Sequence, residues 1–305
     1  MMTLQDMELA ARLDIIDAYY PIDELLSEKT DSKAVAKYYR KSDFFYNHVL
    51  SHGGNFIHMG LSDDQFFHKD DFLKQAQFVG EHISGEGMHI LEVGAGKLAN
   101  TKYLAKTFPN HHFTALDLPN RKFLKNRVPK NVTLVEGNYH DLSCFEENTF
   151  DIAFGVETIC YSETKEKVAE QMARVLKLGG KFIIFDGYEC KPQEEMTDFE
   201  KRVSAVAYAG MRVTSKDQYI GDMLSYLKKH GFTTIDHTDI SQSIRPTLRK
   251  LDCVAGYYFM HPRLLKFLRK IIPYEAGING IAGWLMLMSI DGQHHLYSRI
   301  VATKG

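Results

Sequence analysis

The chain has 305 residues, of which 44% are hydrophobic and 25% charged, as in an ordinary soluble globular protein of one large or two modest domains. Its formal net charge of −2 gives no sign of a nucleic-acid partner. The four cysteines form no C-x-x-C pair, which argues against a zinc ribbon or a disulfide framework and favours a reducing compartment.

The N-terminus is acidic and amphipathic, and it lacks the basic and continuously apolar segments of a signal peptide. The most apolar run, residues 277–290, is too short to span a bilayer. We therefore expect a cytoplasmic protein, with the cytoplasmic face of a membrane as the alternative.

Residues 1–85 are expected to be mostly helical, and from residue 86 short β-like runs alternate with longer helical patterns. This alternation predicts a parallel sheet with helices on both faces. The expected strands are 88–93, 112–118, 131–137, 150–156 and 180–186, and the helices between them are 98–107, 120–127 and 163–176.

A helix that Gly231 closes, a sixth strand over 233–240 and a last strand over 295–304 complete the pattern. We expect the last strand at an edge of the sheet. The predicted fold is α/β, with a seven-stranded doubly wound sheet over residues 86–305. Residues 187–215 and 241–292 interrupt this core, and with residues 1–85 we expect them to form a helical cap over the ligand edge of the sheet.

The turn Gly94-Ala95-Gly96 after the first strand suits three kinds of ligand. A P-loop for nucleoside triphosphates fails because Leu98 and Leu91 stand where that motif needs Ser or Thr and glycine. A dinucleotide site fits better, since Gly94-x-Gly96-x-x-Ala99 satisfies the glycine pattern and an acid follows about 20 residues later.

Acidic or polar residues recur at successive strand ends and favour the third ligand. Glu92, directly before the turn, would repel a pyrophosphate but suits a cation. Asp117 follows the second strand, and Asn138 and Asp141 follow the third. A ligand with an ammonium group, a ribose diol and an adenine needs such a row, and S-adenosylmethionine (SAM) is that ligand.

These segments resemble class I SAM-dependent methyltransferases, whose fold is Rossmann-like. "LEVGAGKLANT" is similar to the first motif of that family, "ALDLP" to the second and "VEGNYHDL" to the adenine-binding segment. "ARVLKLGGKFIIFD" resembles the turn before strand five, with Leu178 in place of the usual proline. Many members carry a third glycine where this chain has Leu98. The resemblance runs from about residue 88 to 186 and implies that SAM is bound and converted to S-adenosylhomocysteine (SAH).

By this resemblance the glycines let the backbone approach SAM, Asp117 binds both ribose hydroxyls and Leu118 packs on adenine. Glu92 would lie near the methionine amine. The cofactor-binding residues that the resemblance implies are Tyr39, Glu92, Gly94, Ala95, Gly96, Asp117, Leu118, Asn138, Tyr139, His140, Asp141 and Gly155.

Residues 36–61 are dense in Tyr, Phe and His. They are similar to the N-terminal segment of a subgroup that contains sterol, tocopherol and isoprenyl-diphosphate C-methyltransferases and cyclopropane fatty acid synthases. The resemblance implies that Tyr39, with Phe45 or Tyr46, closes on the methionine end, where aromatic faces attract the sulfonium. His58 would lie between cofactor and substrate. Packing of a cap helix on the core is the alternative, and no metal site is expected.

The run "GVETICY", residues 155–161, follows the fourth strand and resembles the E-[SA]-x-x-[YH] setting of isoprenoid and sterol C-methyltransferases. Methyl addition to an alkene creates a carbocation, which a buried carboxylate can stabilise or deprotonate. The catalytic candidates are therefore Glu157, Tyr161, Tyr39 and His58. Alternatively, Glu157 only caps the next helix.

Residues 245–270 carry seven basic residues against Asp252, and residues 263–272 would place leucines and isoleucines on one helical face. Such a helix suits peripheral contact with an anionic membrane, while the arginines suit a diphosphate on the substrate. A solvated cap surface is the third interpretation. Phe259, Trp284 and nearby methionines form either an apolar acceptor pocket or the core of the cap.

The sequence thus predicts a SAM-dependent methyltransferase that acts on a small, largely apolar acceptor, with carbon of an isoprenoid, sterol or lipid-like molecule as the target. O- or N-methylation of a small metabolite or amine is the alternative. A binding protein that kept the fold without the chemistry belongs to a different class. No nucleic-acid partner is expected, and a homodimer is left open.

Overall fold

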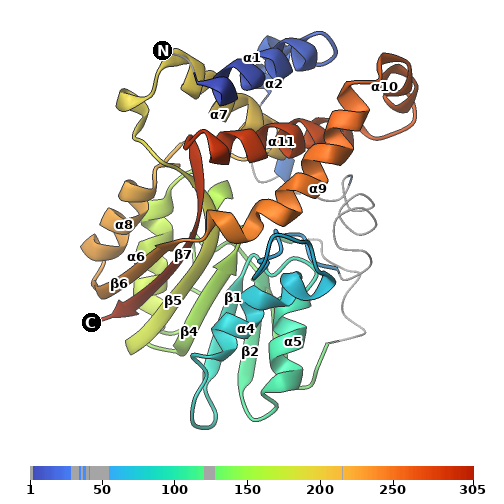
Figure 1. Cartoon of the computed structure of the whole chain (residues 1–305). Helices are drawn as coiled ribbons and strands as arrows, with labels where there is room; N and C mark the ends of the chain where they lie inside the picture. Colours follow the sequence, from blue (N-terminus) through green and yellow to red (C-terminus); the bar gives the residue numbers. More distant parts are fainter. Residues whose placement is uncertain are drawn as a thin grey trace.

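The computed structural model describes residues 3–28, 34–35, 37–38, 41, 55–119, 128–214 and 216–305. At its centre lies a seven-stranded sheet with the order β3-β2-β1-β4-β5-β7-β6 (Figure 1). Its strands are β1 (His89–Val93), β2 (His112–Asp117), β3 (Val132–Glu136), β4 (Phe150–Val156), β5 (Leu176–Glu189), β6 (Phe232–Asp239) and β7 (His295–Lys304). Strands β1 to β5 pair in parallel, and β7 pairs antiparallel with both β5 and β6. The predicted α/β fold with a seven-stranded sheet is confirmed.

The position predicted for the last strand is wrong. Strand β7 lies between β5 and β6, and Ile300 pairs with Ile184 on one side and His237 on the other. Strand β6 forms the edge instead, and most of its residues are partly or fully exposed. Alternation along β7 suggested one solvated face, but the residues on both of its faces are largely buried because neighbours flank it on each side.

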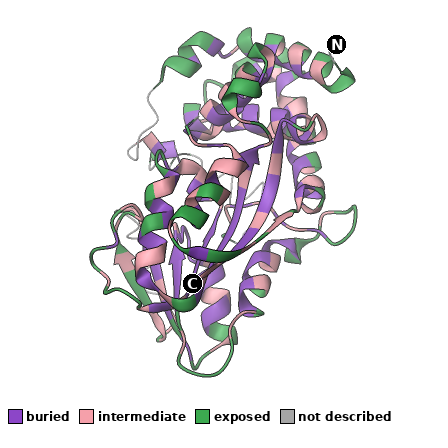
Figure 2. Cartoon of the chain, turned by 90° about the vertical axis from the view of Figure 1, so that its left-hand side faces the viewer, coloured by how far each residue is buried: buried purple, intermediate pink, exposed green. Residues whose placement is uncertain are grey.

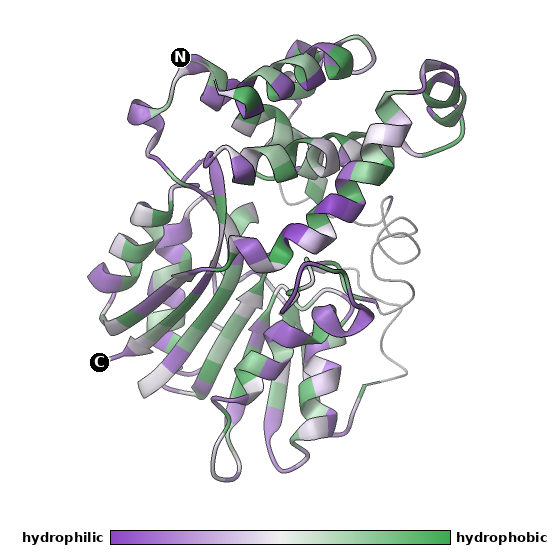
Figure 3. Ribbon diagram, viewed as in Figure 1, coloured by the Kyte–Doolittle hydropathy of each residue, from purple (hydrophilic) through white to green (hydrophobic). Residues whose placement is uncertain are grey.

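Helices cover both faces of the sheet, as predicted. One face carries α6 (Lys165–Val175) and α8 (Ile220–Lys229), whose apolar residues join one cluster with β4 and β5. The other face carries η2 (Lys69–Leu73), α4 (Lys74–Gly80) and α5 (Ala99–Thr107). Figure 2 shows buried residues concentrated along the strands, and Figure 3 shows the hydrophobic residues there. The helix predicted over 120–127 lies outside the described residues.

A helical layer stands beyond the carboxyl ends of β4 and β5 (Figure 1). It consists of α1 (Leu4–Asp17), α2 (Ile22–Ser27), α7 (Asp198–Met211), α9 (Ser241–Phe259), α10 (Pro262–Leu268) and α11 (Tyr274–Asp291). Short 3-10 turns η4 (Ile159–Tyr161) and η5 (Gln193–Glu195) lie after β4 and β5. No helix in the described part of the chain combines the length and apolarity that crossing a bilayer needs.

The helical layer has an apolar core of its own, separate from the two faces of the sheet. Phe259 of α9 and Trp284 of α11 stack with ring centroids 4.9 Å apart. The Arg12 guanidinium from α1 lies over the Trp284 ring and pairs with Asp252 of α9. These contacts join α1, α9 and α11, which lie far apart in the sequence. Phe259 and Trp284 thus form the core of this layer.

The helices of residues 1–85 divide between the two parts of the molecule. Leu9 and Ile16 of α1 belong to the core of the helical layer. Phe72 of η2 and Val79 of α4 pack instead against Ile90 of the sheet cluster. Among the described residues, the N-terminal contribution to the helical layer therefore comes chiefly from α1 and α2.

Candidate active site

Four parallel strands bring most of the predicted cofactor residues to one edge of the sheet. Strands β3, β2, β1 and β4 are neighbours, so their carboxyl ends lie side by side. The turn at Gly94 follows β1, Asp117 ends β2, Asn138 lies two residues after β3, and Gly155 is near the end of β4. Tyr39, Phe45 and Tyr46 lie outside the described residues.

The glycine turn requires glycine at both predicted positions. Gly94 and Gly96 have φ angles of +65° and +53°, a region that side-chain-bearing residues adopt at a cost. A Cβ atom at Gly94 would lie 1.9 Å from the Thr158 hydroxyl oxygen. The turn after β1 thus contacts the loop after β4 directly. Leu98, where many relatives of the family carry glycine, is also left-handed, with φ +62°.

Asp117 holds this turn against the end of β2. Its carboxylate accepts hydrogen bonds from the backbone N–H of Gly96 and, at 2.7 Å, from that of Leu118. The two oxygens of the carboxylate therefore tie the turn after β1 to the residue that follows β2. The side chain is partly exposed, which leaves it accessible to a diol.

Glu92 is buried, and its hydrogen bonds go to helix α5. Its carboxylate accepts bonds from the Asn100 amide at 3.2 Å, from the Thr101 N–H at 3.1 Å and from the Thr101 hydroxyl. A negative charge at a helix N-terminus is favourable. Burial raises the pKa of Glu92 to about 7. The structure therefore assigns Glu92 a supporting role at the start of α5, and its contact with the methionine amine stays a prediction.

His58 belongs to the same buried network. Its Nδ1 lies 2.9 Å from the Met59 carbonyl oxygen and its Nε2 lies 3.3 Å from the Asn100 amide oxygen. Burial lowers the pKa of His58 to about 4, so the imidazole is neutral. The residue packs below the turn and is absent from the lining of the large cavity described next. Its geometry supports positioning of residues 55–62, and a catalytic role stays a prediction.

The residues after β3 brace the loop after β4. The Tyr139 hydroxyl donates to a backbone carbonyl of that loop at 3.1 Å. The His140 ring bridges Asn138, at 2.7 Å, and the Ser162 hydroxyl, at 2.6 Å. Asp141 is exposed, and it accepts a bond from its own turn. Tyr139 and His140 thus have structural partners on the side of the sheet where adenine is expected.

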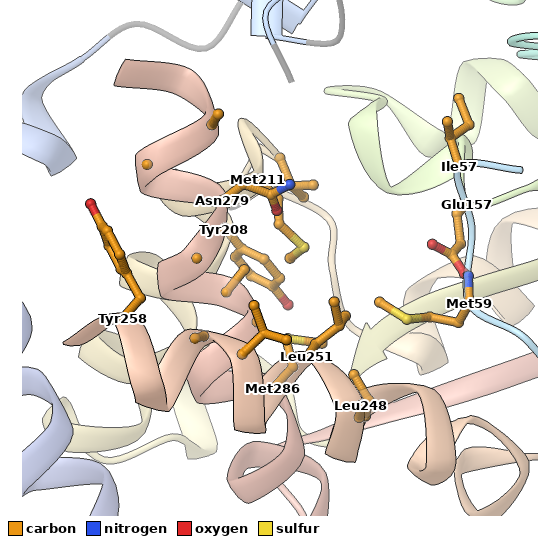
Figure 4. A pocket seen from close by; sticks show the side chains of 18 of the residues that line it. Ile57, Met59, Glu157, Tyr208, Met211, Leu248, Leu251, Tyr258, Asn279 and Met286 are labelled. Atoms are coloured by element: carbon orange, nitrogen blue, oxygen red, sulfur yellow. The ribbon is translucent and has the colours of Figure 1, made fainter. Parts of the chain in front are cut away.

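A cavity of about 650 Å³ lies between the carboxyl ends of β4 and β5 and the helical layer (Figure 4). Its wall is mainly apolar, and its aliphatic members include Leu248, Leu251, Val254, Leu264, Leu268 and Met286. Lys41 is the one Lys or Arg side chain among the described residues of this wall. Such a cavity suits a small uncharged apolar molecule.

Glu157 stands at the sheet end of this cavity. One carboxylate oxygen accepts hydrogen bonds from the Met59 N–H at 2.6 Å and from the Tyr297 hydroxyl at 2.9 Å. Burial raises the pKa of Glu157 to about 8, and the nearby Asp186 carboxylate acts in the same direction. Tyr297 has no motif of its own in the sequence, because only the pairing of β7 with β5 brings it here.

Asp186, a second buried carboxyl, was missed from the sequence. It lies at the cavity wall in β5 and accepts bonds from the N–H groups of Cys160 and Gly187, both at 2.9 Å. Burial raises its pKa. The signal was present, since it is one more acidic residue near a strand end. Tyr161, a predicted site residue, also lines the cavity, and its hydroxyl donates to the Met211 carbonyl at 3.4 Å.

Several basic residues of the run 245–270 contact acidic or aromatic side chains of other segments. Arg245 pairs with Asp291, with an Nη2–Oδ2 distance of 3.1 Å. Lys250 and Arg269 lie over aromatic rings of other segments, 4.5 and 4.7 Å from the ring centroids. None of the seven basic residues lines the described cavity wall. These arginines therefore do not belong to the described cavity wall, and their contact with a diphosphate on the substrate stays a prediction.

Residues 91–184 match the family described as "Methyltransferase domain". Residues 91–184 are a class I SAM-dependent methyltransferase domain. The match covers the glycine turn, Asp117, Glu157 and most of β5, and SAM is the cofactor.

Two relatives of this methyltransferase are named for different reactions. The S-adenosyl-L-methionine-dependent Diels-Alderase iccD of Talaromyces variabilis is 25% identical over 276 residues, 85% of this chain and 93% of that protein. The glycine/sarcosine/dimethylglycine N-methyltransferase of Actinopolyspora halophila is 27% identical over 184 residues, 55% of this chain. The matched part is only 31% of that second protein.

Solved structures share the fold over nearly the whole chain. The [4+2]-cyclase SpnF has a TM-score of 0.66 at 17% identity and covers 90% of this chain and 96% of its own. Geranyl diphosphate methyltransferase in complex with GPP and sinefungin has a TM-score of 0.64 at 16% identity, covering 90% of this chain and 98% of its own. At these identities the likeness shows the fold.

We predict that Gly94→Ala destabilises the methyltransferase far more than Gly85→Ala. Gly85 has a similar φ of +68° with nothing within 4 Å of a Cβ, so it reports the conformational cost alone, about 1–2 kcal/mol. At Gly94 the overlap with Thr158 adds to that cost, and we expect a total above about 3 kcal/mol. Urea unfolding of both variants measures the difference. Equal losses would contradict the close contact.

We also predict that Glu157→Gln gains stability relative to the wild type as pH rises. The folded pKa of about 8 lies above the ordinary 4.5, so the native state binds the proton more tightly and loses stability as pH rises between these values. Glutamine keeps the acceptor oxygen but has no proton to lose. The melting temperatures of the variant and the wild type, measured from about pH 5 to about pH 8, are compared at each pH. Both proteins carry Asp186 and Glu92, so the difference between them reports Glu157. A difference that stays constant with pH would show that Glu157 is not protonated in the fold.

Proposed function

We propose that this methyltransferase transfers the methyl group of SAM to a carbon atom of a small, uncharged, apolar acceptor. The carrying observation is the apolar cavity with Glu157 at its sheet end. We further propose that residues 1–85 and the insertions at 187–215 and 241–292 cap the site, which the core of residues 86–305 builds. Such a cap excludes water from the reaction.

We propose that the sheet edge holds SAM through the residues that the resemblance implied. Gly94 and Gly96 leave the backbone accessible, and the Asp117 carboxylate at the end of β2 would bind the ribose diol. Ile57 links the two sites, because it lines the cavity and its Cδ1 lies 2.8 Å from a Cβ position at Gly96. A methyl donor beside the turn would therefore face the cavity.

SAM, when bound, supplies an electrophilic methyl group on a sulfonium. Transfer of that methyl group to an alkene carbon of the acceptor, with the electron pair of the broken carbon–sulfur bond staying on SAH, would leave positive charge on the neighbouring acceptor carbon. Glu157 would stabilise this charge in its carboxylate form and then take a proton from the adjacent carbon, so that a methylated alkene leaves. Met59 and Tyr297 hold its carboxyl group in position.

The raised pKa of Glu157 fits this role. A nearby cation favours the carboxylate form, so the sulfonium would promote loss of the proton that burial otherwise retains. The carboxyl group would then be ready to accept a proton from the acceptor. Asp186 opposes ionisation through its own negative charge and would keep the affinity of Glu157 for the returning proton high.

Two other reactions have specific support. O- or N-methylation of a small molecule is supported by the N-methyltransferase among the relatives and by two carboxyl groups that could accept an amine. Ring closure by cycloaddition, with SAM bound but not consumed, is supported by the relative that matches most of this chain and is named a Diels-Alderase. A roomy apolar cavity serves either a folded polyene or a smaller acceptor.

Incubation of the purified protein with methyl-labelled SAM and a panel of neutral isoprenoids, sterols, fatty acids and amines tests these reactions. We expect label in a neutral isoprenoid or sterol, and we expect Glu157→Gln to lower kcat about 100-fold with little change in KM. Glu147→Gln, on the exposed surface, is the control.

Each result has a definite meaning. Full turnover by Glu157→Gln would disprove the role of Glu157 in handling the charge. Label in amines alone would favour N-methylation, and an isomerised polyene without SAH would favour cycloaddition.

We propose in addition that the exposed end of α10 contacts anionic lipid. Phe267 and Ile271 are 59% and 62% exposed, and Lys266 and Lys270 stand beside them on the surface. Basic residues around exposed apolar side chains are typical of interfacial segments. Leu268 in the same segment lines the cavity, so an acceptor dissolved in lipid would enter nearby.

Co-sedimentation with vesicles tests this contact. The protein should bind phosphatidylserine-containing vesicles more strongly than phosphatidylcholine vesicles, and Lys266→Glu with Lys270→Glu should abolish the difference. Lys106→Glu with Lys130→Glu reverses the same charge at other exposed positions and should preserve binding. Equal binding by both double variants would contradict a contact through α10.

A further inference from the structure

A chain of hydrogen bonds joins two buried carboxyl groups of the candidate site. Its members are, in order, Glu92 in β1, the Asn100 amide, the His58 ring, the Met59 backbone and Glu157 directly after β4. Figure 4 shows Met59 beside Glu157, to which its N–H donates at 2.6 Å. Glu92 belongs to the predicted cofactor site and Glu157 to the acceptor cavity, so the chain connects the two.

The Asn100 amide stands between Glu92 and His58. Its nitrogen donates to the Glu92 carboxylate at 3.2 Å, and its oxygen lies 3.3 Å from Nε2 of His58. The side chain is 5% exposed, and these are its two hydrogen bonds among the described residues. Rotation of the amide by half a turn exchanges its oxygen and its nitrogen in the same space. The amide can therefore accept from one neighbour while it donates to the other, in either sense.

The His58 ring cannot donate to both of its neighbours. Its Nδ1 lies 2.9 Å from the Met59 carbonyl oxygen, and its Nε2 faces the Asn100 oxygen. Because burial lowers the pKa of His58 to about 4, the ring is neutral and carries a single N–H. In this arrangement one ring nitrogen faces an oxygen with no hydrogen between them, which costs free energy in a buried site.

The protonation of Glu92 decides which ring nitrogen carries the hydrogen. Ionised Glu92 can only accept, so it holds the Asn100 nitrogen, and the amide oxygen then favours a hydrogen on Nε2 of His58. The bare Nδ1 in this state faces the Met59 oxygen. Protonated Glu92 can instead donate to the oxygen of a rotated amide, whose nitrogen donates to Nε2. The hydrogen of His58 then lies on Nδ1, and every contact of the chain has a donor and an acceptor.

The surroundings of Glu92 keep both of its forms within reach. Burial and the negative charge of Asp117 favour the protonated form, three donors of α5 favour the carboxylate, and the pKa is raised to about 7. His58, on the far side of the amide, is neutral, and the strand neighbours Ala115 and Phe154 carry no charge. An ammonium group placed beside Glu92 would therefore shift it to the ionised form.

We propose that Asn100 and His58 are positioning residues that couple the cofactor site to the acceptor site. Ionisation of Glu92 puts the hydrogen of His58 on Nε2, and the bare Nδ1 then repels the Met59 oxygen. The Met59 backbone moves away from the ring, which weakens the hydrogen bond that its N–H donates to Glu157. The meaning for catalysis rests on the proposed function, because Glu157 with a weaker donor has a higher affinity for the proton that it takes from the acceptor.

Two hydrogen bonds keep this segment in place during the change. The Gln75 amide donates to the Met59 carbonyl oxygen at 2.6 Å, and the Tyr297 hydroxyl donates to Glu157 at 2.9 Å. Neither bond involves the His58 ring. The coupling therefore alters one contact of Glu157 while residues 55–62 stay folded.

Nitrogen NMR spectroscopy of the isotope-labelled protein without acceptor tests the coupling, because the shifts of the ring nitrogens identify the tautomer of a neutral histidine. Spectra at about pH 5.5 and about pH 8.5 lie on either side of the pKa of Glu92 and above that of His58. A His58→Gln variant identifies the signals of this ring. We expect the hydrogen on Nδ1 at the lower pH and on Nε2 at the higher pH. Saturating SAH, which carries an ammonium group, should produce the Nε2–H form at the lower pH.

Glu92→Gln and Asn100→Leu break the coupling at different points. The first puts an uncharged amide in place of the carboxyl group, and the second removes the amide that links it to the ring. Each variant should keep the hydrogen of His58 on Nδ1 at both pH values. Glu147→Gln, on the exposed surface, is the matched control and should behave as the wild type does.

The wild-type spectra decide the matter even if a variant fails to fold. A His58 ring that keeps one tautomer at both pH values would overturn the proposal, as would a ring that does not respond to saturating SAH. A folded Glu92→Gln variant in which the tautomer changes as in the wild type would do the same.

The outcomes separate this proposal from the proposed reaction. A tautomer that follows the charge of Glu92 would support the coupling even if no acceptor in the panel were methylated. Methyl transfer to a neutral acceptor by a protein whose His58 tautomer stays fixed would support the reaction while overturning the coupling.

Discussion

The approach of the Gly94 backbone to Thr158 is the contact on which the functional region depends. It joins the turn after β1, where the cofactor residues gather, to the loop after β4, which carries Glu157. A side chain at Gly94 would separate the two loops. Asp117 fixes the same turn from the other side through the Gly96 N–H. The glycine turn and the loop that carries Glu157 are therefore neighbours because the Thr158 side chain packs on the Gly94 backbone without an intervening Cβ.

The helical layer stands over this edge of the sheet and forms, with it, a largely apolar cavity. Buried polar groups stand in two regions of its described wall. Glu157 and Asp186 lie where the strands end, and their raised pKa values follow from the loss of water around them. Asn279 lies in α11, and His295 lies at the start of β7. An apolar wall with polar groups at its ends selects length and polarity of a ligand together.

The same fold serves different chemistry among the relatives, which include an N-methyltransferase and a Diels-Alderase. The reaction therefore has to be argued from the site and not from the fold. In this chain the described cavity wall carries one lysine and none of the arginines of the basic run. That balance favours a neutral acceptor, whereas the basic run in the sequence also allowed a diphosphate.

The sequence by itself determined the parallel strands, the glycine turn and the acidic strand ends, because each depends on residues that are adjacent in the chain. The alternation of apolar residues in a strand and the positive φ angles of the turn depend on neighbouring residues, so the sequence pattern reveals them. Tertiary structure alone decided that β7 lies inside the sheet, which brings Tyr297 to Glu157 and places His295 at the cavity. It also turned Asn279, part of the most apolar run of the chain, toward that cavity. These positions follow from pairing and packing between distant segments, and no local pattern records them.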